Sequence, residues 1–378
     1  MSFPLLKCRR PRRILQAITP ARMSGAEMQL VRMTRLMTGR GHSIATIIKR
    51  GSPAIAEMRR LGLVVEPRAI KGKANLLAMM VLALCARRHR ADLIQSTLST
   101  ASWWSGWLES LGGPPSIGHV QGFTSGAWHR RQTHLLAVSH AVKEHLVAEG
   151  LDRDRITVLY NALSPDEFYP TRDPAIVRAE LGANADTPVV GTFAHLSAKK
   201  GHRELFEAIP KVLREAPKTQ FWIVGQGTLL GELQAVAQQQ GFQDSVRFLG
   251  FRRDVADLMN AINVMALPSR REPCALVYTE AALSRKPVVA CRAGGSPESI
   301  ADGETGLLVP VRDPAAIAEA LLMLLTNRDR SARMGRAGFE RALQLFGWDR
   351  FIYTLEGVYE RVLDERPMKS GCIKRPAA

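Results

Sequence analysis

The chain has 378 residues, enough for two domains with separate hydrophobic cores, and its apolar fraction of 46% is ordinary for a globular protein. Its net charge of +17 is unevenly placed, because residues 1–170 hold 24 lysine and arginine against 11 aspartate and glutamate. This excess predicts an anionic partner for the first half. The basic residues are not interleaved with stacking aromatics, which argues against nucleic acid and favours an anionic membrane surface or a phosphorylated, lipid-linked ligand. A solvated basic face without a partner is the alternative.

Three further features bear on the compartment. The longest uninterrupted apolar run, Leu76 to Ala86, is too short to span a bilayer and predicts a buried helix. The basic N-terminus lacks an adjacent apolar stretch, so we expect no signal peptide. The five cysteines are scattered without metal-binding spacing, which is typical of reduced thiols in the cytosol. We therefore expect a cytoplasmic protein, peripheral at the inner face of the cytoplasmic membrane.

The first half alternates predicted strands and helices. A strand at 13–18, a glycine-containing loop, a helix through Gly39 and a strand at 43–48 form a βαβ unit. Three indoles, Trp103, Trp104 and Trp107, have no strict helical spacing, and core packing is expected, with an apolar acceptor pocket as the alternative. His119 closes a later strand, where it serves either as a structural hydrogen-bonding group or as a site residue. Further strands or strand ends are predicted at 64–65, 93–94, 116–120, 135–139 and 155–159.

The second half repeats this alternation. Lys200 and Gly201 lead from one strand into a helix, and Gly225 opens a Gly-x-Gly turn after the next strand. A compact cation at a helix N-terminus joins the helix dipole in stabilising negative charge. Strands are predicted at 188–193, 220–224, 246–250, 262–267 and 287–291, and helices at about 203–216, 254–261, 313–325 and 330–363, the last broken near 346–348.

The stretch from residue 268 to 309 carries the strongest signal. Glu272 lies in a loop just after a buried strand, and Glu280, after seven intervening residues, is predicted to open a helix. Gly294 and Gly295 follow the next strand. Ligands of open α/β sheets bind where strand ends meet helix N-termini. Carboxylates accept hydrogen bonds from sugar hydroxyls and amides of small residues approach phosphates, so this pattern predicts a polyhydroxylated, phosphorylated ligand.

These glutamates, framed by Pro-Ser before and by Pro-Val-Val, Gly-Gly and Pro-Glu after, resemble the E-x7-E signature of the retaining family 4 glycosyltransferases (glycosyl transferases group 1). The resemblance implies a GT-B fold of the α/β class, two Rossmann-like doubly wound domains facing across a cleft. It implies an acceptor-binding domain at 1–170, completed by a terminal helix at 349–365, and a nucleotide-sugar-binding domain at 171–348. Residues 366–378 lack periodicity and are expected to form a disordered tail.

The resemblance also implies roles for individual residues. Glu272 would lie by the donor sugar, together with His119, and Glu280 would bind the ribose hydroxyls. Lys200 would reach the donor phosphate, and Glu272, His119 and Lys200 form the implied catalytic set. The remaining implied contacts to the nucleotide sugar are backbone groups or nearby side chains at Gly25, His195, Gly225, Phe248, Ala275 and Leu276.

Three positions depart from the family pattern. His195 stands where an arginine is usual, Pro273 follows the first glutamate in place of glycine, and Arg285 replaces a glycine before Lys-Pro. These departures support an alternative, a degenerate GT-B domain that binds a partner. A GT-B epimerase or phosphorylase is a further alternative with the same glutamate pair.

The implied reaction is transfer of a sugar from a nucleotide-diphosphate sugar to a hydroxyl of a glycan or lipid-linked acceptor, with retention of configuration. Bacterial lipopolysaccharide or another surface polysaccharide is the expected product pathway. No cofactor or metal is expected. Asp152 and Asp154 mimic the Asp-x-Asp metal pair of other glycosyltransferases, but they lie in a predicted turn.

Overall fold

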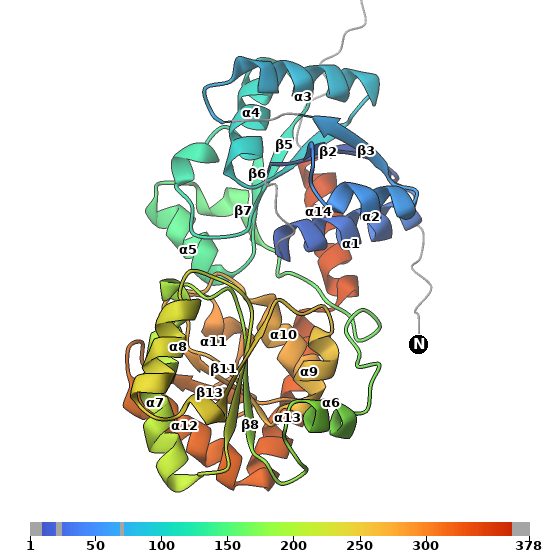
Figure 1. The fold of residues 1–378 in the computed structure, drawn as a ribbon. Helices are drawn as coiled ribbons and strands as arrows, with labels where there is room; N and C mark the ends of the chain where they lie inside the picture. The colour runs from blue at the N-terminus through green and yellow to red at the C-terminus, as the bar shows by residue number, and fades with distance from the viewer. Residues whose placement is uncertain (1–9, 20–24, 69–71, 365–378) are drawn as a thin grey trace, which may run out of the picture. The chain divides into compact units, whose positions relative to one another are not determined.

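The computed structural model describes residues 10–19, 25–68 and 72–364. They divide into two compact units (Figure 1). The first unit comprises the described residues up to 137, residues 146–159 and those from 352 onward. The second comprises residues 138–145 and 160–351. The expected boundary at residue 170 stays a prediction, and the expected tail at 366–378 lies outside the described residues.

The first unit contains a seven-stranded parallel sheet in the order β3-β2-β1-β4-β5-β6-β7. Strands β2 and β3 are added on one side of β1, and β4 to β7 are added on its other side. The strand order therefore reverses between β1 and β4. Five of the strands match ranges predicted from the sequence closely. Their bounds are Arg13–Ile18 (β1), Ser43–Lys49 (β2), Val64–Arg68 (β3), Leu93–Thr97 (β4), Ser116–Val120 (β5), His134–Ala137 (β6) and Ile156–Val158 (β7).

Helices pack on both faces of this sheet (Figure 1). Helices α3 and α4 cover one face, where Leu15, Ile47 and Ile94 pack with Leu82 and Trp104. The helices are Gly25–Gly39 (α1), Ala54–Arg60 (α2), Leu76–Arg88 (α3), Ser99–Ser110 (α4) and, at the end of the chain, Trp348–Asp364 (α14). The tryptophans therefore lie on a helix that their spacing does not reveal, and core packing is confirmed for Trp104, which is buried.

The C-terminal helix α14 is tied to the first unit by polar contacts. Arg40 donates to Glu356 at 2.7 Å, and the His42 ring lies 3.1 Å from the same carboxylate. Tyr359 is buried and donates its hydroxyl to the buried Gln95 side chain. Because Gln95 belongs to β4, helix α14 packs against the middle of the first sheet.

Helix α3 corrects one expectation. It spans the apolar run as predicted, but it is only half buried. Ala78, Leu82 and Cys85 face the sheet, whereas Leu76 and Met80 are more than half exposed. From Leu76 to Ala86 the helix is apolar on all sides, and one sheet can cover only one side of a helix. Among the described residues no helix is both long and apolar enough to cross a membrane.

The second unit contains a six-stranded parallel sheet in the order β10-β9-β8-β11-β12-β13. Its order reverses between β8 and β11, which are hydrogen-bonded neighbours. The predicted strands are confirmed within one or two residues, and β13 completes the expected alternation. The bounds are Val189–Phe193 (β8), Gln220–Val224 (β9), Val246–Gly250 (β10), Val264–Leu267 (β11), Val288–Cys291 (β12) and Gly306–Val309 (β13).

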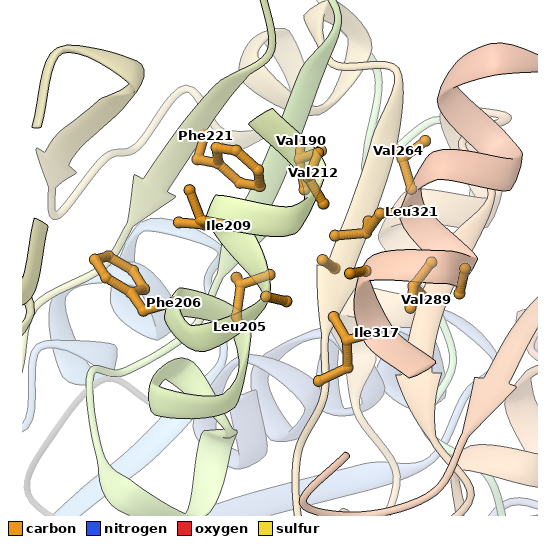
Figure 2. Packing of buried hydrophobic residues seen from close by; sticks show 14 of the residues in the cluster. Val190, Leu205, Phe206, Ile209, Val212, Phe221, Val264, Val289, Ile317 and Leu321 are labelled. Carbon is orange, nitrogen blue, oxygen red and sulfur yellow. The ribbon is translucent and has the colours of Figure 1, made fainter. Parts of the chain in front are cut away.

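Strand residues of the second sheet alternate between two cores. Val190, Phe221 and Val264 pack against α7 and α12, as Figure 2 shows. Their neighbours Trp222 and Met265 pack on the opposite face with α9 and α10. Burial on both faces is typical of a parallel, doubly wound sheet. The remaining helices, of which α5 has residues in both units, are His140–Ala148 (α5), Pro174–Glu180 (α6), His202–Glu215 (α7), Leu230–Gln239 (α8), Val255–Ala261 (α9), Leu276–Leu283 (α10), Ser296–Ser299 (α11), Pro314–Thr326 (α12) and Arg328–Leu345 (α13).

Candidate active site

Two predicted site residues meet where the strand order of the second sheet reverses. Lys200 lies in the loop after β8, and Glu272 lies in the loop after β11. The Lys200 ammonium donates to the Glu272 carboxylate at 2.7 Å. The exposed fractions of the two side chains are 20% and 8%. A crevice at the carboxyl ends of the strands, beside such a reversal, is the usual ligand site of open α/β sheets.

Gly201 brings the Lys200 loop against the end of β11. Its φ of +74° is in the left-handed region, and a Cβ atom there would lie 1.9 Å from the Pro268 carbonyl oxygen. The loops are also joined by a backbone hydrogen bond of 2.9 Å from Arg270 to the Lys199 carbonyl. Only glycine permits both this conformation and this approach. Gly201 therefore permits the close approach of the two loops that places Lys200 beside Glu272.

The glycine pair after β12 positions the Glu272 loop from the other side. The Gly295 amide donates to the Glu272 carbonyl at 2.7 Å, and Gly294 forms an isolated parallel bridge with Glu272. A Cβ on Gly294 would lie 2.2 Å from the Glu272 carbonyl oxygen. The sequence led us to expect small-residue amides on phosphates here, and for Gly295 this is wrong, because its amide is already bonded. Sequence alone does not distinguish a glycine that approaches a ligand from one that approaches backbone.

Helix α10 corrects the expected position of Glu280. The helix begins at Leu276, so Glu280 lies in its second turn and is not favoured by the N-terminal dipole. The N-terminus instead follows Ala275, which has extended backbone and provides no side-chain cap, and the first turn holds no acidic residue. The first amides of a helix have no intrahelical partner. The amides at Ala275 and Leu276 are therefore suited to an anion, and their contact with a donor diphosphate stays a prediction.

Glu298 has a role that the sequence did not reveal. Its carboxylate accepts backbone hydrogen bonds from His140 at 2.7 Å and Ala141 at 2.8 Å, and one from the Tyr160 hydroxyl at 2.9 Å. Burial, and next the negative charge of Glu298, raise the pKa of Tyr160. The carboxylate thus caps the N-terminus of α5. Glu298 therefore holds the backbone at the start of α5 in place. A Pro-Glu pair in the sequence does not by itself indicate such a contact.

The remaining predicted residues of the second unit lie at neighbouring strand ends. His195 is exposed in the loop after β8. The Gly225 amide after β9 donates to the Gly250 carbonyl at 2.8 Å. Phe248 is on the edge strand β10, and its ring packs 6.0 Å from the ring of Phe206. The pairing of β10 with β9 shifts register between Phe248 and Gly250, so the backbone at this edge is irregular.

Two predicted residues, Gly25 and His119, belong to the first unit. Gly25 is the exposed first residue of α1, while the loop before it lies outside the described residues. His119 is the fourth residue of β5 and is 1% exposed. Burial lowers the pKa of His119 to about 4, and the ring lies 3.0 Å from the Gln121 side-chain amide. At neutral pH His119 is therefore an uncharged hydrogen-bonding group.

The Asp152 and Asp154 pair lies in a turn. Asp152 accepts a hydrogen bond from the Asp154 amide at 3.0 Å, so its carboxylate caps the short 3-10 turn that precedes β7. Within the described ranges no group of three or more histidine, cysteine, aspartate or glutamate side chains is arranged to hold a metal ion.

Two family models match successive parts of this chain. The model described as Glycosyltransferase Family 4 matches residues 23–167, and the model described as Glycosyl transferases group 1 matches residues 187–327. The chain belongs to the family 4 glycosyltransferases. The second match contains the loops of Lys200 and Glu272 and helix α10. The first contains Gly25 and His119.

Named relatives and a solved structure agree with this membership. A D-inositol 3-phosphate glycosyltransferase of Corynebacterium kroppenstedtii is 31% identical over 62% of this chain and 54% of its own length. A GDP-mannose-dependent alpha-(1-6)-phosphatidylinositol monomannoside mannosyltransferase of Mycolicibacterium smegmatis is 36% identical over 55% of this chain and 53% of its own. The chain thus spans about half the length of these relatives. The structure of Anabaena HepE with UDP and glucose matches with a TM-score of 0.83 and 23% identity, over 93% of this chain and all of that chain. The fold is GT-B.

Proposed function

We propose that this family 4 glycosyltransferase transfers a sugar from a nucleotide-diphosphate sugar to a hydroxyl group of a glycan or lipid-linked acceptor, with retention of configuration. The observation that carries the proposal is the ion pair between Lys200 and Glu272 at the strand-order reversal of the second sheet. The uncapped N-terminus of α10 follows in the same loop as Glu272. A cation, a carboxylate and free amides are the groups that a diphosphate joined to a sugar requires.

In this proposal the bound donor breaks the ion pair between Lys200 and Glu272. The diphosphate takes over Lys200 and the amides near Ala275 and Leu276, which stabilise the charge of the leaving group. Glu272 is then released to accept hydrogen bonds from the hydroxyls of the donor sugar. Glu280, one turn into α10, holds the ribose. These groups would supply the charge stabilisation that a metal ion supplies in other glycosyltransferases.

We infer the roles of His119 and Gly25, which lie in the first unit, from the family resemblance. His119 is neutral at physiological pH, because burial keeps its pKa near 4. It is therefore suited to hydrogen bonding with a sugar hydroxyl and not to balancing phosphate charge. Gly25 offers backbone at the start of α1, where a helix N-terminus favours an anion.

The acceptor is proposed to carry a phosphate or a lipid phosphate. The names of two relatives specify inositol phosphate and a phosphatidylinositol mannoside as their substrates, and the first 170 residues of this chain carry the excess of positive charge. We place the protein at the cytoplasmic face of the membrane, in the synthesis of a surface glycan or glycolipid. Lipopolysaccharide is one such product.

A panel of nucleotide sugars tests the donor. A true donor stabilises the folded protein by mass action, by about 2.7 kcal/mol at a concentration 100 times its dissociation constant. We expect one UDP- or GDP-sugar to raise the unfolding temperature and the matched free sugar to leave it unchanged. Incubation of that donor with lipid-linked acceptors should give an α- or β-linked product of the same configuration as the donor. A product that is an epimer of the donor would establish the epimerase alternative, and absence of any stabilising nucleotide would favour the partner-binding scaffold.

A further inference from the structure

Helix α3 of the first unit exposes large aliphatic side chains along one face. Leu76, Leu77, Met80 and Leu84 are 66%, 64%, 56% and 63% exposed. At 3.6 residues per turn these four positions share one side of the helix. A surface helix of a globular protein usually presents charged or polar residues on that side. We call these four residues the apolar stripe.

Basic residues continue the apolar stripe at the C-terminal end of α3. Arg87 and Arg88 form its last turn and are exposed, and the helix contains no acidic residue. Their positions follow Met80 and Leu84 by seven and four residues, so they lie on the same side. Arg88 also reaches Glu66 at 3.3 Å while its side chain stays 67% exposed. The face therefore grades from aliphatic to cationic along about 20 Å of helix.

The start of α3 is held rigidly. The indole N–H groups of Trp104 and Trp103 donate to the carbonyls of Gly72 at 2.9 Å and Lys73 at 3.1 Å. The Lys73 ammonium lies 3.1 Å from the centre of the Trp128 ring, and the Asn75 side chain caps the helix by accepting from the Leu77 amide. These contacts fix the apolar stripe in place, so its exposure belongs to a well-packed helix and not to a frayed end.

We propose that the apolar stripe docks on an anionic lipid surface, with α3 lying in the plane of the membrane interface. The aliphatic side chains would enter the boundary between headgroups and acyl chains, and Arg87 and Arg88 would contact lipid phosphates. Charge complementarity selects this occupant, because the positive excess of the first 170 residues favours a broad anionic surface. The proposal deepens the lipid-linked acceptor of the proposed function and rests on it for its biological purpose, but docking itself needs neither donor nor acceptor.

Vesicle flotation tests this surface directly. The full chain, without donor or acceptor, is mixed with vesicles of phosphatidylcholine alone or with roughly 30% phosphatidylglycerol, which supplies anionic headgroups. We expect binding to the anionic vesicles that weakens as salt is raised. The triple variant Leu77→Ser, Met80→Ser, Leu84→Ser should lose at least about tenfold in partition coefficient. Its unfolding temperature should fall by only a few degrees, because the three side chains are already more than half exposed and serine costs about 0.5 kcal/mol of helix propensity at each position.

A matched control removes apolar surface from the second unit. Met323 and Leu343 are 41% and 45% exposed, and Met323→Ser with Leu343→Ser should bind vesicles as the unchanged protein does. Arg87→Gln with Arg88→Gln should reduce binding and flatten its salt dependence. Equal flotation of the triple variant and the unchanged protein overturns the proposal, as does the absence of binding to anionic vesicles. A change of oligomeric state in the triple variant would instead assign the stripe to a second copy of the chain. Donor stabilisation, measured in parallel, reports on the proposed function separately.

Discussion

The ion pair between Lys200 and Glu272 leaves neither charge uncompensated in the absence of donor. Glu272 is buried and Lys200 is mostly buried, so removal of one partner leaves the other as an unpaired buried charge. The exposed pair of Lys211 and Glu319, with an ammonium-to-carboxylate distance of 2.8 Å, is a matched reference on the surface. The two pairs differ in burial and not in length.

Lys200→Ala should therefore lower the free energy of unfolding by about 2 kcal/mol, whereas Lys211→Ala should lower it by less than about 0.5 kcal/mol. The double variant Lys200→Met with Glu272→Gln should regain most of that loss, because no charge is left unpaired. Urea unfolding of the four proteins measures these values. Equal losses at Lys200 and Lys211 would show that the buried pair contributes no more than a surface pair.

Lys200→Ala should also slow transfer in the fraction that stays folded. Removal of one preorganised donor to a leaving group costs about 3 kcal/mol of transition-state stabilisation, or roughly a hundredfold in turnover at saturating donor. Lys211→Ala is again the control, with unchanged turnover. A turnover for Lys200→Ala within twofold of the control would remove Lys200 from the site.

The three residues that depart from the family pattern differ in how close they lie to the candidate site. Arg285 lies before β12, at the end of the strand opposite the Glu272 loop, and its φ of +54° is a conformation that glycine adopts more readily. Its guanidinium lies 4.7 Å from the centre of the Phe339 ring. Arg285 therefore gives no support to a degenerate site. His195 and Pro273, in contrast, lie in the loops that carry Lys200 and Glu272.

At the scale of elements, glycines hold the Lys200 and Glu272 loops in contact. Gly201 has a φ of +74°, and Gly241 at the end of α8 has a nearly identical φ of +73°. A Cβ on Gly241 would meet nothing within 4 Å, whereas on Gly201 it would collide with the Pro268 carbonyl. The two positions separate the cost of the backbone conformation from the cost of the collision.

Gly241→Ala should destabilise the protein by about 1 kcal/mol, the cost of the left-handed backbone alone. Gly201→Ala should cost at least about 2 kcal/mol more, because the loop must move away from β11. The same movement separates Lys200 from Glu272, so donor stabilisation should fall only in the Gly201 variant. Thermal unfolding with and without donor measures both effects. Similar behaviour of the two variants would contradict the close approach of the loops.

The sequence predicted strands better than it predicted where side chains lie. Buried apolar runs bounded by glycine and proline located most strands of both sheets, because parallel strands are apolar on both faces. The beginning of α10 was misplaced because the residues before Glu280 are β-branched or aromatic, whereas the helix is set by packing of Tyr278 and Ala281. The sequence did not predict that one side of α3 is exposed. An apolar run indicates that a helix can be buried, but it does not show whether other elements cover all of its sides. The contacts of Glu298 and Gly295 depend on residues far apart in the chain, which a local pattern cannot show.

At the scale of the whole molecule, buried histidines make folding sensitive to acid. His119, His129 and His202 are each 1% exposed, and burial lowers the pKa of each from 6.5 to about 4. Above pH 6.5 all three are neutral in both states and have no effect. As the pH falls below 6.5 the unfolded chain binds protons that the folded chain excludes, so stability is lost progressively down to about pH 4.

Between pH 7.5 and pH 5.5 we expect a loss of about 1 kcal/mol for each buried histidine. Carboxylates with lowered pKa, such as Glu356, do not titrate in this window. His129→Gln should reduce the loss of unfolding free energy between pH 7.5 and pH 5.5 by about 1 kcal/mol. Urea unfolding at the two pH values measures this difference. An unchanged slope in that variant would mean that His129 becomes protonated without unfolding.

The proposed mechanism requires that the donor diphosphate displaces Glu272 from Lys200. Calorimetric titration of the Glu272→Gln variant with the nucleoside diphosphate of the best donor tests it most directly. Because the substitution removes the carboxylate that competes for Lys200, we expect the variant to bind the nucleoside diphosphate as tightly as the unchanged protein does, or severalfold more tightly. Sugar transfer should fall sharply in the same preparation, and Glu280→Gln should instead weaken nucleoside diphosphate binding. Weaker binding by folded Glu272→Gln, or undiminished transfer, would contradict the claim.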